Sequence, residues 1–156
     1  MSENYEEIQP KTFKFGQVGD FIKGTLTDVS KTTSPDAYKK YSHIYSVLAE
    51  EGIFLGSSKN EKTGKYVLDA EQTVISKGEQ YTVFISDDKG VVIGKMKDIS
   101  IGQKFKIEFT ELKPTDKGND AKIVKVFAGK NADGTPLMDQ EYLDSKKTPE
   151  DGYEQM

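Results

Sequence analysis

Residues 104–129 read KFKIEFTELK, PTDKGND and AKIVKVFAG in succession, and this stretch decides the fold. In the first run Phe105, Ile107 and Phe109 alternate with lysine and glutamate, and a period of two is typical of a strand with one buried face. The last run is rich in β-branched residues, and the middle run holds a proline, a glycine and an asparagine, which favour turns. Together the three runs predict a β-hairpin with a long, lysine-bearing tip.

The segments before this hairpin predict an all-β domain. Residues 91–101 have the apolar spacing of one short helix, and Glu51-Gly52 is typical of a tight turn. A short helix followed by a closing hairpin is how an OB-fold barrel ends, so we expect a five-stranded OB-fold-like barrel with this helix between strands 3 and 4. Alternating or β-rich patterns predict the preceding strands at residues 12–15, 21–30, 43–50, 53–55, 66–68, 73–75 and 79–86.

Charge is distributed unevenly along the 156 residues. Of a net charge of −4, residues 1–10 carry −3 and residues 139–156 carry −4, which leaves +3 for the residues between. We therefore expect an acidic N-terminal arm at residues 1–11, the barrel at 12–130, and an acidic, partly disordered and flexible tail at 131–156. Within that tail, a marginal helix is expected around residues 137–144.

The composition argues against several classes of function. The chain has no cysteine and a single histidine, His43, which excludes disulfides, cysteine–zinc sites and histidine metal clusters. No motif nominates a catalytic pair, so we expect a protein that is not an enzyme and needs no cofactor or metal; an enzyme with carboxylates remote in sequence is a third interpretation. Because no apolar run is long enough to cross a membrane and residues 1–10 are not a signal peptide, we expect a cytoplasmic protein with no membrane partner.

Two predicted loops, residues 31–42 and 113–122, carry lysines, and the first also carries tyrosines. In an OB fold the two loops at these places bind oligonucleotides, and single strands are held by cations along the backbone and rings beneath the bases. We expect the lysines to contact phosphates and the tyrosines to stack on bases. The predicted nucleic-acid-binding residues are Lys23, Tyr38, Lys39, Lys40, Tyr41, Tyr45, Lys113, Lys117 and Lys122.

Each of these residues also has a plain structural interpretation. Any lysine can be solvated surface, and Tyr38 and Tyr41 can pin their loop to the barrel. On the predicted sheet Tyr81 and Phe84 are further candidate platforms, but they point to opposite faces, so at least one of them belongs to the core.

Three short motifs carry a resemblance to a known family. They are GDFIKGTL at residues 19–26, IGQKFKI at 101–107 and KGNDAK at 117–122. In this layout the chain resembles phage- or virus-type single-stranded DNA-binding proteins of the OB-fold class over residues 12–129. The resemblance implies binding of single-stranded DNA, with RNA an open alternative, in replication or recombination. It also implies an acidic tail that recruits replication proteins or competes with DNA, and it leaves a homo-oligomer possible.

A second interpretation keeps the barrel and changes its use. An OB-fold domain can serve as a protein-interaction module, as a viral assembly component or as an inhibitor of a host nucleic-acid enzyme. Acidic side chains gathered on one face would favour this interpretation, because such a surface imitates the charge of DNA.

Overall fold

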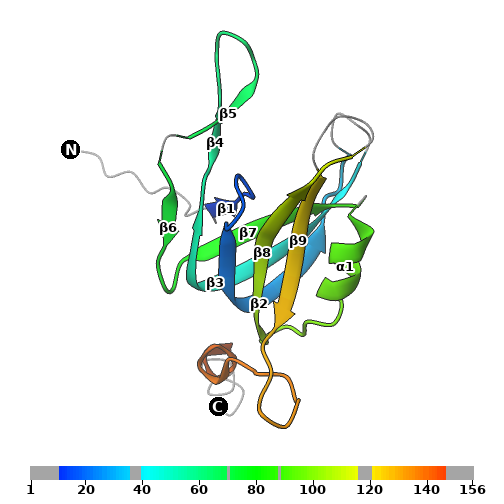
Figure 1. Ribbon diagram of the computed structural model, residues 1–156. Coiled ribbons are helices and arrows are strands. Elements are labelled where there is room, and N and C mark those ends of the chain that lie inside the picture. The colour runs from blue at the N-terminus through cyan, green and yellow to red at the C-terminus, as the bar shows by residue number, and fades with distance from the viewer. Residues whose placement is uncertain (1–10, 36–39, 70, 88, 116–120, 147–156) are drawn as a thin grey trace, which may run out of the picture.

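The computed structural model describes residues 11–35, 40–69, 71–87, 89–115 and 121–146. Most of this chain is strand, which confirms the all-β class and the hairpin at residues 104–129 (Figure 1). The elements are β1 (Lys11–Phe13), β2 (Phe21–Lys31), β3 (Ser42–Phe54), β4 (Ser57–Lys59), β5 (Tyr66–Leu68), β6 (Thr73–Ile75), β7 (Gln80–Ser86), α1 (Gly90–Met96), β8 (Lys104–Lys113) and β9 (Ala121–Ala128). A second short helix covers residues 140–146.

The main sheet is open and mixed. Its strands run in the order β1-β7-β3-β2-β8-β9, β6 adds to the far end of β3, and β4 and β5 form a separate ribbon (Figure 1). Only β1 and β7 pair in parallel; the other pairs are antiparallel. Within the described residues no strand pairing joins β9 to β1 or β7, so the closed five-stranded barrel is not confirmed.

The core is filled by the inward-facing residues of the long strands, with α1 adding Ile93 and Met96. On β7 the inward residues include Tyr81, which is 1% exposed, whereas Phe84 on the opposite face is 50% exposed. This confirms that at least one of the two rings is core. The inward residues of β2, β3, β7 and β8 are Ile22, Leu26, Tyr45, Val47, Ala49, Tyr81, Val83, Ile85, Phe105, Ile107 and Phe109.

One predicted turn is wrong. β3 runs without a break through Glu51-Gly52, which the sequence pattern assigned to a tight turn between two strands. Gly52 instead lies where neighbouring elements come very close. A Cβ there would stand 2.5 Å from the carbonyl oxygen of Phe21 and 2.8 Å from Cδ1 of Ile75. The glycine is needed for this approach of β2 and β6, which is a common reason for glycine inside a strand.

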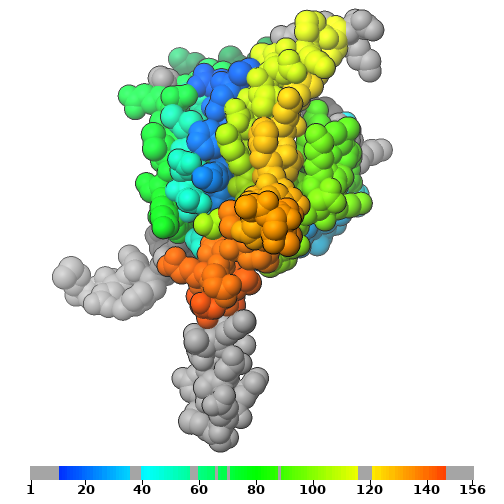
Figure 2. Space-filling model, turned by 60° about the horizontal axis from the view of Figure 1, so that its bottom comes forward, coloured from blue at the N-terminus to red at the C-terminus, as the bar shows by residue number. Residues whose placement is uncertain are grey.

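The segment after β9 continues the domain. Backbone hydrogen bonds join Lys104 N to Leu137 O (2.8 Å) and Asp139 N to Gly102 O (2.7 Å), so residues 130–139 are fastened to the start of β8. Figure 2 shows this segment lying across one end of the sheet. The ordered domain therefore extends past residue 130, and the helix expected around residues 137–144 begins at residue 140.

Asp139 ties this segment to β2. Its Oδ2 accepts a hydrogen bond from Thr25 Oγ1 (2.5 Å), and its Oδ1 accepts one from the backbone N–H of Tyr142 (3.0 Å). Burial acts to raise the pKa of Asp139, but these donors together with nearby Lys104 outweigh it and hold the pKa below its ordinary value. A carboxyl with a lowered pKa contributes stability above its unfolded-state pKa, and this contribution is lost as the pH falls through the folded-state pKa.

We expect Thr25→Val to lower the free energy of unfolding by about 1.5–3 kcal/mol near neutral pH, because it removes a hydrogen bond to a charged group. As the pH falls below about 4, the usual pKa of an aspartate in an unfolded chain, and on through the lower pKa of the folded state, the carboxyl takes up a proton and the difference from the unchanged protein should shrink. Urea unfolding of both proteins near pH 7 and near pH 3 measures this. Thr27→Val is the matched control, since Thr27 Oγ1 donates to the carbonyl oxygen of Ser46 (3.1 Å). Its effect on the free energy of unfolding should not depend on the protonation of Asp139. A Thr25→Val effect of the same size at both pH values would contradict the assignment.

Candidate nucleic-acid interface

The described ends of the two predicted loops reach the C-terminal end of β7 from two sides. The backbone N–H of Asp87 donates to the carbonyl oxygen of Tyr41 (2.9 Å), which holds the end of the first loop against this point. On the other side, a cavity of about 430 Å³, here called the seam cavity, lies between the end of β7, α1 and the start of β9. Its lining residues are Phe15, Phe84, Ile85, Ser86, Lys89, Val92, Ala121, Lys122 and Val124.

Phe84 is the exposed ring at this end of β7. It lies on the outer face of β7, opposite Ile44 of β3 in the strand register, and half of its surface is open to solvent. Phe84 is a candidate platform in the sequence but not one of the predicted binding residues. A signal was present: the other residues on its face of the strand, Gln80, Thr82 and Ser86, are all polar, so Phe84 is the one apolar side chain on a solvent-facing row.

Tyr41 is partly open, with 36% of its surface exposed. Lys31 Nζ lies 5.5 Å from the centroid of the Tyr41 ring, and it also pairs with Asp87 Oδ2 at 3.4 Å. His43 Nε2 lies 2.9 Å from the other oxygen of Asp87. The ring is thus braced by its neighbours and still accessible, so it both pins the loop end and offers a surface for stacking.

The predicted stacking role of Tyr45 is wrong. Tyr45 is 3% exposed and belongs to the core, on the same face of β3 as Val47 and Ala49. Burial raises the pKa of its phenol. Alternation along β3 separates two faces correctly, but the hydroxyl does not keep Tyr45 on the outside, because the ring supplies more apolar area than one polar atom costs.

The predicted lysines fall in different places. Lys122 Nζ donates to the carbonyl oxygen of Phe15 (2.7 Å) and lies 5.7 Å from the centroid of the Phe109 ring, so this side chain braces the seam cavity. Lys40 and Lys113 are exposed at the described ends of the two loops, and Lys113 is the register partner of Ala121. Tyr38, Lys39 and Lys117 lie outside the described residues.

Lys23 does not join this group. It lies eight positions before Lys31 on β2, which is about 26 Å along an extended strand. Its ammonium group pairs with Glu51 at 3.6 Å. It faces a different part of the surface, the outer side of β2 and β8.

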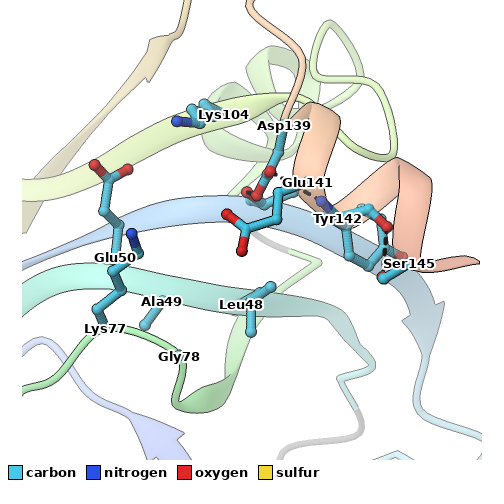
Figure 3. A pocket seen from close by; sticks show the side chains of 11 residues that line it. Leu48, Ala49, Glu50, Lys77, Gly78, Lys104, Asp139, Glu141, Tyr142 and Ser145 are labelled. Atoms are coloured by element: carbon cyan, nitrogen blue, oxygen red, sulfur yellow. Dashed lines mark hydrogen bonds between the residues drawn. The ribbon is translucent and has the colours of Figure 1, made fainter.

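A second cavity, of about 320 Å³, lies between the outer side of β2 and β3 and the helix at residues 140–146. Figure 3 shows the carboxylates of Glu50, Asp139 and Glu141 reaching into it. Two lysines, Lys77 and Lys104, also line this cavity. Three carboxylates against two lysines leave the lining with a net negative charge, so this cavity is a poorer place for a nucleic-acid backbone than a lysine-lined surface.

Neither a cluster of metal-binding side chains nor a membrane-spanning helix is found in the parts of the chain that the structure describes. No group of three or more His, Cys, Asp or Glu side chains there could hold a metal ion. None of the helices there is long and apolar enough to cross a bilayer.

No protein-family model matches the chain, and no curated protein matches it.

Proposed function

We propose that the protein binds single-stranded nucleic acid, DNA in the first place, with little sequence preference and without catalysing a reaction. The observation that carries this proposal is the exposed ring of Phe84, which lines a cavity with Ala121 and Lys122 at the end of the second loop. The end of the first loop is held to Asp87, just past the end of the same strand. Rings beneath the bases and cations along the backbone are what a single strand requires. We call Lys31, Tyr41, Phe84 and Lys89, with Lys40 and Lys113 at the loop ends, the loop-end surface.

The strand order supports an OB-type arrangement for this surface. If β2, β3, β7, β8 and β9 are counted as strands 1 to 5, they lie in the order 3-2-1-4-5 with α1 between strands 3 and 4. An OB fold, which is a partly open Greek-key barrel, binds oligonucleotides on the face of strands 2 and 3 and through two flanking loops. Strands 2 and 3 are β3 and β7, and Phe84 lies on their outer face. On these grounds we propose a role in phage-type replication or recombination, with replication proteins as partners of the acidic C-terminal residues.

The charge of the surface shapes the expected affinity. Lys31 already shares its charge with Asp87, so stacking should contribute more than phosphate contacts. With about three to four lysine contacts, the logarithm of the affinity should fall against the logarithm of salt concentration with a slope of about −2 to −3.

Fluorescence anisotropy on a labelled oligo-dT, read at increasing salt, tests the proposal. An abasic strand of the same length is the control, and it should bind more weakly because its phosphates remain while its bases are gone. Absence of binding to oligo-dT at low salt would overturn the proposed function. Equal affinity for both strands would show that stacking of bases on the aromatic rings does not contribute to binding.

The interaction-module alternative has one observation in its favour. Glu50, Asp139 and Glu141 gather acidic groups around the cavity beside the helix at residues 140–146, and a concentrated acidic surface suits a basic protein partner. If the chain acts as a viral assembly component or an inhibitor of a host nucleic-acid enzyme, oligo-dT should not bind. Replacing Glu50 and Glu141 with glutamine, while keeping Asp139 because it holds the segment after β9 to β2, should then abolish binding to the partner.

A further inference from the structure

A second lysine–aromatic surface lies on the outer side of β2, β8 and β9. We call Phe21, Lys23, Lys104, Lys106 and Phe127 the outer-face patch; together they line a groove of about 520 Å³. Figure 2 shows these three strands side by side, with the segment after β9 bordering one end of the face. Phe127 is 45% exposed and lies near the end of β9, the last strand in the sheet order.

Lys106 is the centre of the patch. In the strand register it lies opposite Lys23 on one side and opposite Phe127 on the other. Its Nζ is 4.9 Å from the ring centroid of Phe21 and 5.6 Å from that of Phe127. Because the face of an aromatic ring attracts a cation, the two rings and the ammonium group form one preorganised unit instead of three independent surface residues.

The patch brings lysines of two neighbouring strands together, and glutamates beside them balance part of their charge. Like charges directly opposite on neighbouring strands destabilise a sheet, and Lys23 and Lys106 are such a pair. Each is partly balanced by a glutamate, Glu51 at 3.6 Å and Glu108 at 2.9 Å. Lys104 adds a third ammonium group to the same groove, although it also acts on Asp139, and Glu50 lines the groove as well. A ligand that brings phosphates for the lysines and flat bases for the rings would satisfy both halves of the patch.

We propose that a second stretch of the same single strand binds at the outer-face patch, after crossing the β8–β9 hairpin from the loop-end surface. This inference rests on the proposed function and adds that the bound strand is longer than one surface covers. The hairpin separates the two surfaces, since Val124 lines the seam cavity while Phe127 and Lys106 lie on the outer face.

A nucleic acid fits this patch better than an acidic peptide. Extended peptides usually gain affinity by adding a strand to a free sheet edge. The strands that carry the three lysines have no free edge here, because β2 pairs with β3 and β8, and β8 pairs with β2 and β9. Within the described residues β9 has one unpaired edge, but that edge borders the seam cavity and α1, away from the three lysines. A nucleic-acid strand binds through lysine and aromatic side chains and needs no free strand edge, and the patch offers such side chains.

Binding to oligo-dT of two lengths tests the inference. For the double variant Lys106→Ala with Phe127→Leu, we expect unchanged affinity for a strand of about 6 nucleotides, which the loop-end surface can hold alone. For a strand of about 20 nucleotides the affinity should fall by about 5- to 150-fold, because one stacked base and one phosphate contact are lost. Phe127→Tyr keeps a ring and should keep the affinity. Lys62→Ala removes an exposed lysine from the turn between β4 and β5 and should change neither value.

Cross-linking of the unchanged protein to a long oligonucleotide with halogenated uracil gives a second measurement that does not depend on a variant folding. The peptide that contains Phe127 should carry the cross-link with the long strand and not with the short one. The inference is overturned if the folded double variant binds the long strand with full affinity, or if the peptide with Phe127 carries no cross-link. In either case the proposed function still stands if the unchanged protein binds the short strand. A double variant that loses affinity for polyglutamate but keeps it for long oligo-dT also overturns it, in favour of an acidic protein partner. Failure of the unchanged protein to bind either length overturns the proposed function itself.

Discussion

Replacing Asp20 with alanine should lower the free energy of unfolding by about 3 kcal/mol, because three backbone N–H groups lose a charged acceptor. The carboxylate is fully buried. Its Oδ2 accepts from the N–H groups of Gly16 (2.8 Å), Gln17 (2.9 Å) and Leu55 (3.1 Å). It thereby fastens the loop before β2 to the end of β3. Chemical denaturation followed by circular dichroism measures the change.

Asp20→Asn separates charge from hydrogen bonding in this experiment. The amide keeps one acceptor oxygen for the three N–H groups, so the expected loss is about 1–2 kcal/mol. If the alanine variant unfolds at the same denaturant concentration as the unchanged protein, Asp20 does not hold the loop. The result also bears on binding, since the fastened loop carries Phe15, which lines the seam cavity and accepts the hydrogen bond from Lys122.

Replacing Tyr41 and Phe84 together with alanine should weaken binding of oligo-dT by about 2–6 kcal/mol, since each stacked ring contributes about 1–3 kcal/mol per base. Both rings are partly exposed, so the double variant should still fold. Anisotropy at low salt measures the affinity, and each single variant should account for part of the loss.

Two further variants control for this result. Phe84→Tyr keeps a ring and should keep most of the affinity. Val74→Ala removes apolar surface from β6, where Val74 is 69% exposed, and should have no effect on binding. Affinity equal to that of the unchanged protein in the double variant would show that bases do not stack on these rings.

The sequence predicted the strands best where alternation was strict. Phe105, Ile107 and Phe109 alternate with charged residues, and the structure buries all three on one face of β8, as expected. At Gly52 the local pattern was misleading, because the reason for the glycine is the approach of Phe21 and Ile75, which are distant in sequence. A glycine in a local sequence pattern is compatible with a turn, but the pattern does not show that a strand distant in sequence comes close to that glycine.

The exposed rings were harder to predict than the strands. Alternation sorts Tyr45 and Phe84 onto faces of their strands but does not say which face is the core, and the more polar ring turned out to be the buried one. Lys23 and Lys106 likewise look like ordinary surface lysines in sequence. Only the strand register shows that they are neighbours and that Phe127 lies beside them.

The segment after β9 was assigned to a flexible tail because its composition is polar. What fastens it is a set of polar contacts with remote partners, above all Asp139 with Thr25, 114 positions apart. Such contacts leave no periodic signal in the sequence, because each depends on one pair of residues brought together by the whole fold.

Amide chemical-shift mapping during titration with a short oligo-dT of about 6 nucleotides asks where the strand binds. If the loop-end surface holds it, the amide signals of Tyr41, Phe84, Asp87, Lys89 and Ala121 should shift together and first. Shifts confined to the helix at residues 140–146 and the acidic cavity beside it, or no shifts at all, would show that the two loop ends and Phe84 do not form a binding surface for single-stranded nucleic acid.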